Sequence, residues 1–171
     1  MGVSLPSATA LGVVCRPATD DDLPFLADVY ASTRAEEVAS TGWPPEMQRQ
    51  FLASQFDAQH RHYRRHYPDA EWLVIEKDGN GLGRLYVEEW PSQVRLIDIA
   101  LLPEARGTGI GTALIEDLKA HAREAGKPLS IHVERNNPAM SLYIRLGFVK
   151  ADEHGIYDLM EWGREAAASA S

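Results

Sequence analysis

The chain has 171 residues, of which 44% are hydrophobic, and its net charge is −8. This size suits one domain with a single core, and the acidic balance argues against a nucleic-acid partner, because phosphate backbones require an excess of Lys and Arg. The lone Cys15 excludes an intrachain disulfide framework and a Cys-based metal site, and no apolar run is long enough to span a membrane. With no signal peptide in the pattern, we expect a cytoplasmic protein with one domain, residues 11–162, and flexible tails at residues 1–10 and 163–171.

The chain opens with a predicted strand and helix. Residues 11–16 are apolar enough for a strand, which Pro17 stops. Thr19 or Asp20 can then cap a helix that continues to about Ser32.

A second helix is predicted over residues 45–67, because Pro45 suits a first helical turn and apolar side chains follow at helical spacing. These are Met47, Phe51, Phe56 and Tyr63. His62 and His66 stand one turn apart, as metal ligands can, but no H-E-x-x-H pattern is present and Arg residues surround them. We interpret this helix as solvated or substrate-facing.

The remainder of the chain predicts an α/β fold built on a mixed, mostly antiparallel sheet with helices on both faces. Asp78-Gly79-Asn80-Gly81 is a strong hairpin signal between the first two strands of this part. The third and fourth strands flank a long helix and should therefore pair in parallel. The six predicted strands cover residues 72–77, 82–88, 94–102, 129–134, 147–152 and 156–162.

Two helices are predicted between these strands. The longer one includes Ile110 as its first apolar position and ends at Gly126, which supplies a left-handed stop. The shorter one has Asn137 as its cap, Pro138 in first position and Gly147 at its end.

The junction before the long helix carries Arg106 and three glycines spaced two apart, Gly107, Gly109 and Gly111. Glycines allow backbone N–H groups to approach an anion, and the start of a helix adds free donors and a positive dipole end. The alternative is an ordinary strand-to-helix turn whose glycines serve packing. Three glycines beside an arginine at such a junction favour a phosphate site.

Residues 106–111, Arg-Gly-Thr-Gly-Ile-Gly, resemble the Arg/Gln-x-x-Gly-x-Gly/Ala signature of the GNAT superfamily of acyl-CoA-dependent N-acyltransferases. Residues 136–148 resemble the same family's Asn…Ala…Leu-Tyr…Gly-Phe element, in the family's order and at its usual separation. The resemblance covers residues 96–162, extends to residues 13–16 and 72–88, and says little about residues 20–69. Neither G-x-G-x-x-G nor the P-loop motif is present.

The resemblance implies that the strands on either side of the long helix splay apart at a CoA site. The backbone of residues 106–111 would hold the CoA pyrophosphate, and the pantetheine arm would lie along the strand that ends at Leu102. A backbone N–H near Ala100 or Leu101 would face the thioester oxygen, and Asn136 would position the arm. The expected CoA-binding residues are Leu101, Leu102, Arg106, Gly107, Thr108, Gly109, Ile110, Gly111, Thr112, Asn136 and Tyr143.

The catalytic residues expected from the resemblance are a tyrosine acid and a carboxylate base. Tyr143 corresponds to the tyrosine that protonates the departing thiolate, although it could instead pack against Met140 and Leu146. An alkylammonium, with a pKa of about 10.4, must lose a proton before attack. Three strand residues could accept that proton, in the order Glu134, Asp98 and Glu88, and each could also be an ordinary exposed acid.

The resemblance implies a metal-free transfer of an acetyl group from acetyl-CoA to a primary amine by direct attack. The alternative is an acyl-CoA-binding sensor or scaffold without turnover. Residues 33–67 should determine substrate choice, because segments at a cleft mouth vary freely. Their aromatic and Arg side chains fit an aromatic or acidic-tailed amine, or simply a core with a solvated face. The acceptor and a homodimeric state stay open.

Overall fold

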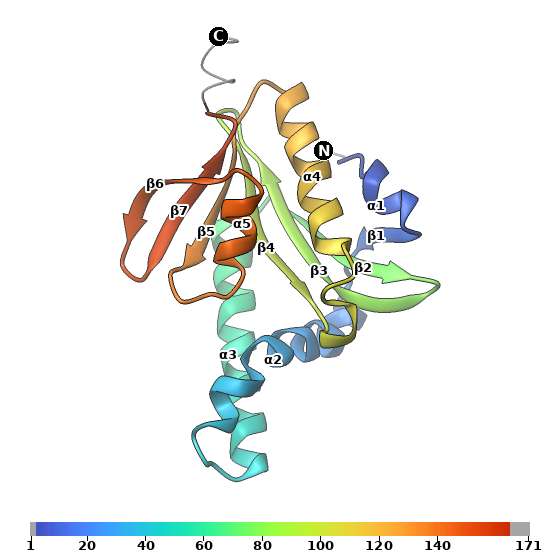
Figure 1. The fold of residues 1–171 in the computed structure, drawn as a ribbon. Helices are drawn as coiled ribbons and strands as arrows, with labels where there is room; N and C mark the ends of the chain where they lie inside the picture. Colours follow the sequence, from blue (N-terminus) through green and yellow to red (C-terminus); the bar gives the residue numbers. More distant parts are fainter. Residues whose placement is uncertain (1–2, 165–171) are drawn as a thin grey trace.

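Seven strands form one sheet with helices on both faces in the computed structural model, which describes residues 3–164 (Figure 1). The expected tails at residues 1–2 and 165–171 lie outside the described residues. The strands are β1 Val13–Pro17, β2 Glu71–Lys77, β3 Asn80–Glu89, β4 Val94–Leu101, β5 Leu129–Glu134, β6 Val149–His154 and β7 Tyr157–Trp162.

The strands pair in the order β1-β2-β3-β4-β5-β7-β6. Each neighbouring pair is antiparallel except β4 with β5, which a helix connects as a parallel crossover requires. The predicted mixed, mostly antiparallel sheet is therefore confirmed.

The turn between β2 and β3 has the geometry that its residues predict. Asp78 and Gly79 have φ values of 54° and 76°, and a two-residue type I′ hairpin turn requires positive φ at both positions. The predicted antiparallel hairpin is confirmed, and β3 begins at Asn80, two residues earlier than the pattern suggested.

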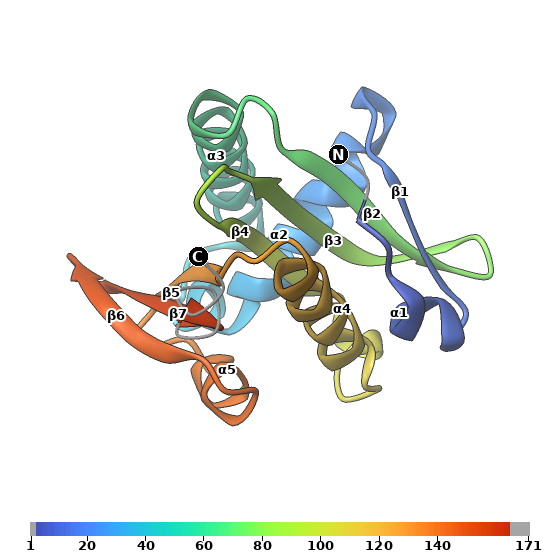
Figure 2. The same ribbon diagram turned by 90° about the horizontal axis from the view of Figure 1, so that it is seen from above.

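Within residues 3–164, five α-helices cover the sheet, with α1, α4 and α5 on one face and α2 and α3 on the other (Figure 2). Their bounds are α1 Pro6–Ala10, α2 Leu23–Ala39, α3 Pro45–His66, α4 Ile110–Glu124 and α5 Met140–Arg145. The larger core lies beneath α4, where Leu85, Leu96, Leu114 and Leu118 are fully buried. The smaller core, under α2 and α3, consists of Leu26, Tyr30, Phe56 and Val74.

The helix α2 is longer than its sequence pattern predicted. We expected it to end near Ser32, but it continues to Ala39. No glycine or proline occurs between Ser32 and Gly42, and the intervening Ala, Arg and Glu residues favour helix. Thr19 caps a short 3-10 turn, Asp20–Asp22, which leads directly into α2.

The helix α3 begins at Pro45 as predicted, but its apolar positions differ in burial. Phe56 is 7% exposed, whereas Met47 and Phe51 are 49% and 39% exposed. The cause is position, because the first half of α3 projects beyond the sheet (Figure 1).

The helix α5 begins later than predicted. Asn137 Oδ1 accepts the Ala139 N–H at 2.8 Å, so the cap closes a turn and the helix itself starts at Met140. Gly147, with a φ of 94°, follows its end as predicted.

The first ten residues were expected to form a tail, but residues 6–10 form the helix α1. The buried carboxylate of Asp117 on α4 accepts the backbone N–H groups of Ser7 and Ala8 at 2.9 and 3.0 Å. Ala8 itself is 1% exposed. Because these donors sit at the start of α1, Asp117 acts as a helix cap supplied from 109 residues away.

Replacing Asp117 with alanine is expected to lower the free energy of unfolding by about 1–3 kcal/mol, because buried N–H groups lose their acceptor. Urea denaturation measures this change. Asp152→Ala, which removes an acid 62% exposed on β6, should leave the midpoint nearly unchanged. Equal midpoints for the two variants would contradict a capping role for Asp117.

Candidate functional site

The strands β4 and β5 pair only where they begin. The parallel register joins Val94 to Leu129 and Arg95 to Ser130, and from Leu96 onward β4 has no β5 partner. β5 continues to Glu134 as a partner of β7 instead. The two strands therefore diverge and leave one backbone edge of β4 free.

A β-bulge accompanies this divergence. Tyr86 of β3 lies opposite Asp98, but the next residue, Val87, lies opposite Leu96, so Ile97 is an extra residue in β4. A bulge bends its strand and increases its twist. Closer to the end of β4, a Cβ on Gly83 would stand 2.1 Å from the Ala100 carbonyl oxygen, so this approach of the two strands requires glycine.

The segment after β4, residues 106–111, is called the glycine loop. Gly107 and Gly109 have φ values of 71° and 86°, and no atom lies within 4 Å of the positions where their Cβ atoms would be. After Arg106, the next backbone N–H that donates a hydrogen bond is that of Ala113, which donates to the Gly109 carbonyl at 3.0 Å. The six N–H groups from Gly107 to Thr112 thus have no acceptor in residues 3–164. Such a row of free donors at a helix start suits an anion.

A cavity of about 340 Å³, called the front cavity, lies between the glycine loop, β4 and α5. Seven of the predicted CoA-binding residues line it: Leu101, Arg106, Gly107, Gly109, Gly111, Thr112 and Tyr143. Ala100, expected to lie near the thioester oxygen, lines the cavity as well. The expected CoA-binding residues did not include six others: Ile99, Ile115, Ala139, Ser141, Leu142 and Arg145. Ile115 could have been found, since it lies one helical turn after Gly111, and the last four belong to α5 or its approach.

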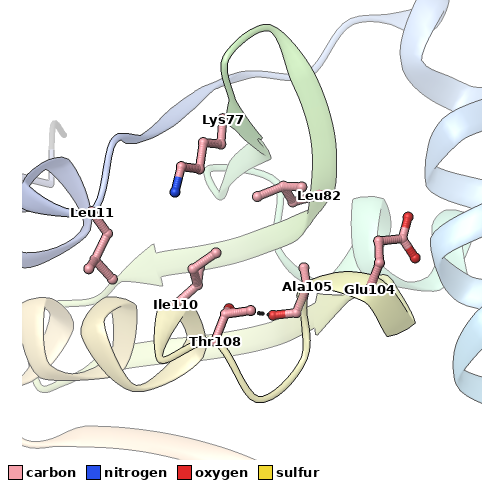
Figure 3. Close-up of a pocket in the computed structure, with 7 residues that line it drawn as sticks. All are labelled: Leu11, Lys77, Leu82, Glu104, Ala105, Thr108 and Ile110. Atoms are coloured by element: carbon pink, nitrogen blue, oxygen red, sulfur yellow. Dashed lines mark hydrogen bonds between the residues drawn. The ribbon is translucent and has the colours of Figure 1, made fainter.

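Four predicted residues are not part of this lining. Leu102 donates its N–H to the Leu82 carbonyl at 2.8 Å, and Asn136 lies exposed in the connection after β5. Thr108 and Ile110 line a second cavity of about 220 Å³ behind the loop, called the rear cavity (Figure 3). The N–H groups of Thr108 and Ile110 nevertheless belong to the free row.

Arg106 connects the glycine loop to α2. Its Nε donates to the Leu101 carbonyl at 3.0 Å, and its Nη2 donates to the carbonyl and hydroxyl oxygens of Ser32 at 3.3 and 3.4 Å. The side chain therefore holds the loop conformation as well as lining the front cavity.

Tyr143 projects from α5 into the wall of the front cavity. The residue is 4% exposed, and its ring packs edge-on against Phe148 with centroids 5.6 Å apart. Burial, followed by the charge of Asp98, raises the pKa of the phenol well above its ordinary value. The hydroxyl therefore stays protonated throughout the neutral range and can act as a proton donor.

Asp98 is held on the α2 and α3 face of the sheet. It forms an ion pair with the buried guanidinium of Arg84, whose Nη2 also donates to Gln59 Oε1 at 2.8 Å. Among the described carboxylates, Asp98 is the one whose charge raises the pKa of Tyr143. The charge of Asp98 therefore acts on a residue that lines the front cavity.

The other two predicted bases lie differently. Glu134 stands at the end of β5, where its Oε2 is 3.8 Å from Arg34 Nη1 on α2. Glu88 is buried and accepts hydrogen bonds from Trp90 Nε1 and the Asp69 N–H. Because Glu88 lies beside the start of β4, far from the glycine loop, its position does not favour a role there.

Cys15 and the histidines of α3 take no part in this site. Burial raises the pKa of the Cys15 thiol to about 11, and β2 and β3 separate its strand from β4. The rings of His62 and His66 lie 4.0 Å apart, yet nowhere in residues 3–164 do three His, Cys, Asp or Glu side chains gather as metal ligands. None of the described helices is long and apolar enough to cross a membrane.

The acetyltransferase (GNAT) family model matches residues 31–148. The chain belongs to this GNAT family. Among curated GNAT relatives, a putative [ribosomal protein bS18]-alanine N-acetyltransferase from Bacillus subtilis is 34% identical over 47% of this chain and 54% of its own length. An N-alpha-acetyltransferase from Sulfurisphaera tokodaii is 32% identical over 47% of this chain and 57% of its own length. The chain thus spans little more than half the length of these relatives.

Solved structures show the same fold. PaiA N-acetyltransferase from Thermoplasma acidophilum, solved in complex with coenzyme A, superimposes with a TM-score of 0.65 at 19% identity, covering 87% of this chain and 97% of that one. This chain therefore has the GNAT fold.

Proposed function

We propose that this protein transfers an acetyl group from acetyl-CoA to a primary amine by direct attack, without a metal or a covalent enzyme intermediate. The observation that carries the proposal is the row of six free N–H groups from Gly107 to Thr112, which opens onto a cavity that reaches Tyr143. GNAT family membership supports the same reaction.

The residues of the front cavity fit coenzyme A. The free N–H row suits the pyrophosphate, and the space over Gly107 and Gly109 leaves room for its oxygens. Arg145 lines the same cavity and adds a positive charge that the sequence did not single out. Along the splayed β4, backbone groups and the apolar Ile99 can hold an extended arm. The bound thioester would supply the activated acetyl group.

We assign acid catalysis to Tyr143 and base catalysis to a carboxylate on one of the strands. Tyr143 would give its proton to the departing thiolate, for which its protonated state suits it. We place Asp98 before Glu134 as the proposed base, because the charge of Asp98 contributes to the raised pKa of Tyr143. Arg84 would hold the Asp98 carboxylate in place, and Glu134 would line the mouth through which the amine enters.

The acceptor we propose is the N-terminal α-amine of a polypeptide. The names of both curated relatives support it, since one acts on an alanine of a ribosomal protein and the other is an N-alpha-acetyltransferase. Such a reaction fits a cytoplasmic protein, with acetyl-CoA and the acceptor as its partners and nucleic acid and membrane having no part in it.

Thiol release from acetyl-CoA with a panel of amines tests this function. We expect turnover with peptides bearing a free N-terminus, and none with the same peptides after N-terminal blocking. Acetyl-CoA should also raise the thermal midpoint, because it binds the folded chain only. Stabilisation without turnover on any amine would instead support the sensor or scaffold alternative.

Asp98→Asn is expected to depress the rate most at low pH, where the acceptor is protonated and its deprotonation limits turnover. The acidic limb of the rate profile should move to higher pH, while acetyl-CoA affinity stays close to that of the parent. Glu134→Gln, measured in parallel, should change the profile little. The reverse result would make Glu134 the base, and no change in either variant would leave deprotonation to water.

A further inference from the structure

The rear cavity lies on the side of the glycine loop opposite the front cavity, and the proposed acetyl transfer does not use it. It occupies about 220 Å³ between the turn before β1, the β2–β3 hairpin and the loop (Figure 3). Its lining consists of Leu11, Lys77, Leu82, Glu104, Ala105, Thr108 and Ile110.

The glycine loop is the wall between the two cavities. Residues 106, 107, 109, 111 and 112 line the front cavity, whereas residues 104, 105, 108 and 110 line the rear one. A ligand in the rear cavity therefore contacts the same short segment that also lines the front cavity. Two ligands that each prefer one arrangement of this segment must influence each other's affinity.

Lys77 gives the rear cavity an uncompensated positive charge. The other three lysines of the chain, Lys119, Lys127 and Lys150, each pair with a carboxylate, whereas Lys77 has no ion pair or hydrogen bond within residues 3–164. Its ammonium group points into the space bordered by Leu11, Leu82 and Ile110 (Figure 3). Lys77 is exposed, so its ammonium group is solvated. Beside the apolar Leu11, Leu82 and Ile110 it can pair with an anionic group attached to an apolar body.

Size and charge narrow the class of ligand further. The cavity, of about 220 Å³, is smaller than the roughly 300–1,000 Å³ typical of pockets for drug-sized ligands, which indicates a small ligand. Glu104 lies at the end of the cavity away from Lys77 (Figure 3), and its charge disfavours a second anionic group there. These features describe a monoanion with a short aliphatic chain.

We propose that the rear cavity binds a short-chain aliphatic monocarboxylate, with its carboxylate on Lys77 and its chain over Leu11, Leu82 and Ile110. Its occupancy sets the arrangement of the glycine loop and thereby changes the affinity of the front cavity for acetyl-CoA. This coupling rests on the proposed function, whereas the binding of the carboxylate does not.

Sodium hexanoate is the probe that tests the site. Its binding is measured by amide chemical-shift changes in a ¹⁵N-labelled chain and by calorimetry. We expect saturable binding, with shifts at Leu11, Leu82 and residues 104–110. Lys77→Gln should weaken binding about two- to fivefold, as loss of an exposed ion pair does. Lys150→Gln, on the opposite edge of the sheet, should leave it unchanged. Hexylamine, which reverses the charge of the head group, should not bind.

Any of three results would contradict the rear site. The chemical shifts fail to saturate, the two lysine variants bind hexanoate equally well, or the shifts are confined to the front cavity. Coupling is measured separately, by titrating acetyl-CoA with and without saturating hexanoate. We expect the acetyl-CoA affinity to change severalfold, and hexanoate affinity to change by the same factor when acetyl-CoA is present. Hexanoate binding with no reciprocal change would remove the coupling, while failure of acetyl-CoA alone to bind would count against the proposed function.

Discussion

Gly109→Glu is expected to weaken acetyl-CoA binding at least about a hundredfold and to abolish turnover at ordinary acetyl-CoA concentrations. The carboxylate would stand over the row of free N–H groups and repel the pyrophosphate that we propose they bind. Because no protein atom lies within 4 Å of a Cβ built on Gly109, the new side chain has open space at its base and can extend toward the ligand. Calorimetry with acetyl-CoA measures the loss directly.

Gly126→Glu is the matched control for this variant. Gly126 also has a positive φ, 69°, and open space where a Cβ would be, but it follows the far end of α4. Both variants carry the same backbone strain and the same added charge, so any cost to folding should be similar. Binding that survives in Gly109→Glu, or that is lost equally in Gly126→Glu, would contradict a phosphate site at the glycine loop.

Tyr143→Phe is expected to lower kcat by about ten- to a thousandfold and to leave acetyl-CoA affinity nearly intact, as loss of a general acid should. The ring keeps its packing against Phe148, so the fold should be retained. Steady-state rates, with acetyl-CoA affinity measured separately, distinguish this result from a loss of binding.

Tyr86→Phe serves as the comparison for Tyr143→Phe. Tyr86 is 2% exposed, and burial raises the pKa of its phenol also, but its ring packs on the α2 and α3 side of the sheet against Trp72 and Tyr63. Removing this hydroxyl should change turnover far less. Unaltered turnover in Tyr143→Phe would make Tyr143 a packing residue only, and equal losses in both variants would indicate a general effect of removing a buried hydroxyl.

Local signals predicted most of the secondary structure, because they act within a few residues. The Asp78-Gly79 turn defined the β2–β3 hairpin, and Gly126 stopped α4 where the sequence placed its end. The same signals failed where their effect depended on distant contacts. Residues 6–10 carry no strong helix pattern, and their helix is capped by Asp117, far along the chain.

By itself, the sequence determined the glycine loop, since a strand, spaced glycines and an amphipathic helix are encoded in consecutive residues. It also placed Tyr143 on the short helix that reaches the front cavity. The resemblance implied that β4 and β5 splay apart, but only the tertiary structure decided that they diverge after Arg95 and that Arg84 pairs with Asp98. It also turned Thr108 and Ile110 toward the rear cavity. Backbone conformation follows from neighbours in the chain, whereas strand divergence, ion pairing and cavity walls arise only when distant segments pack together.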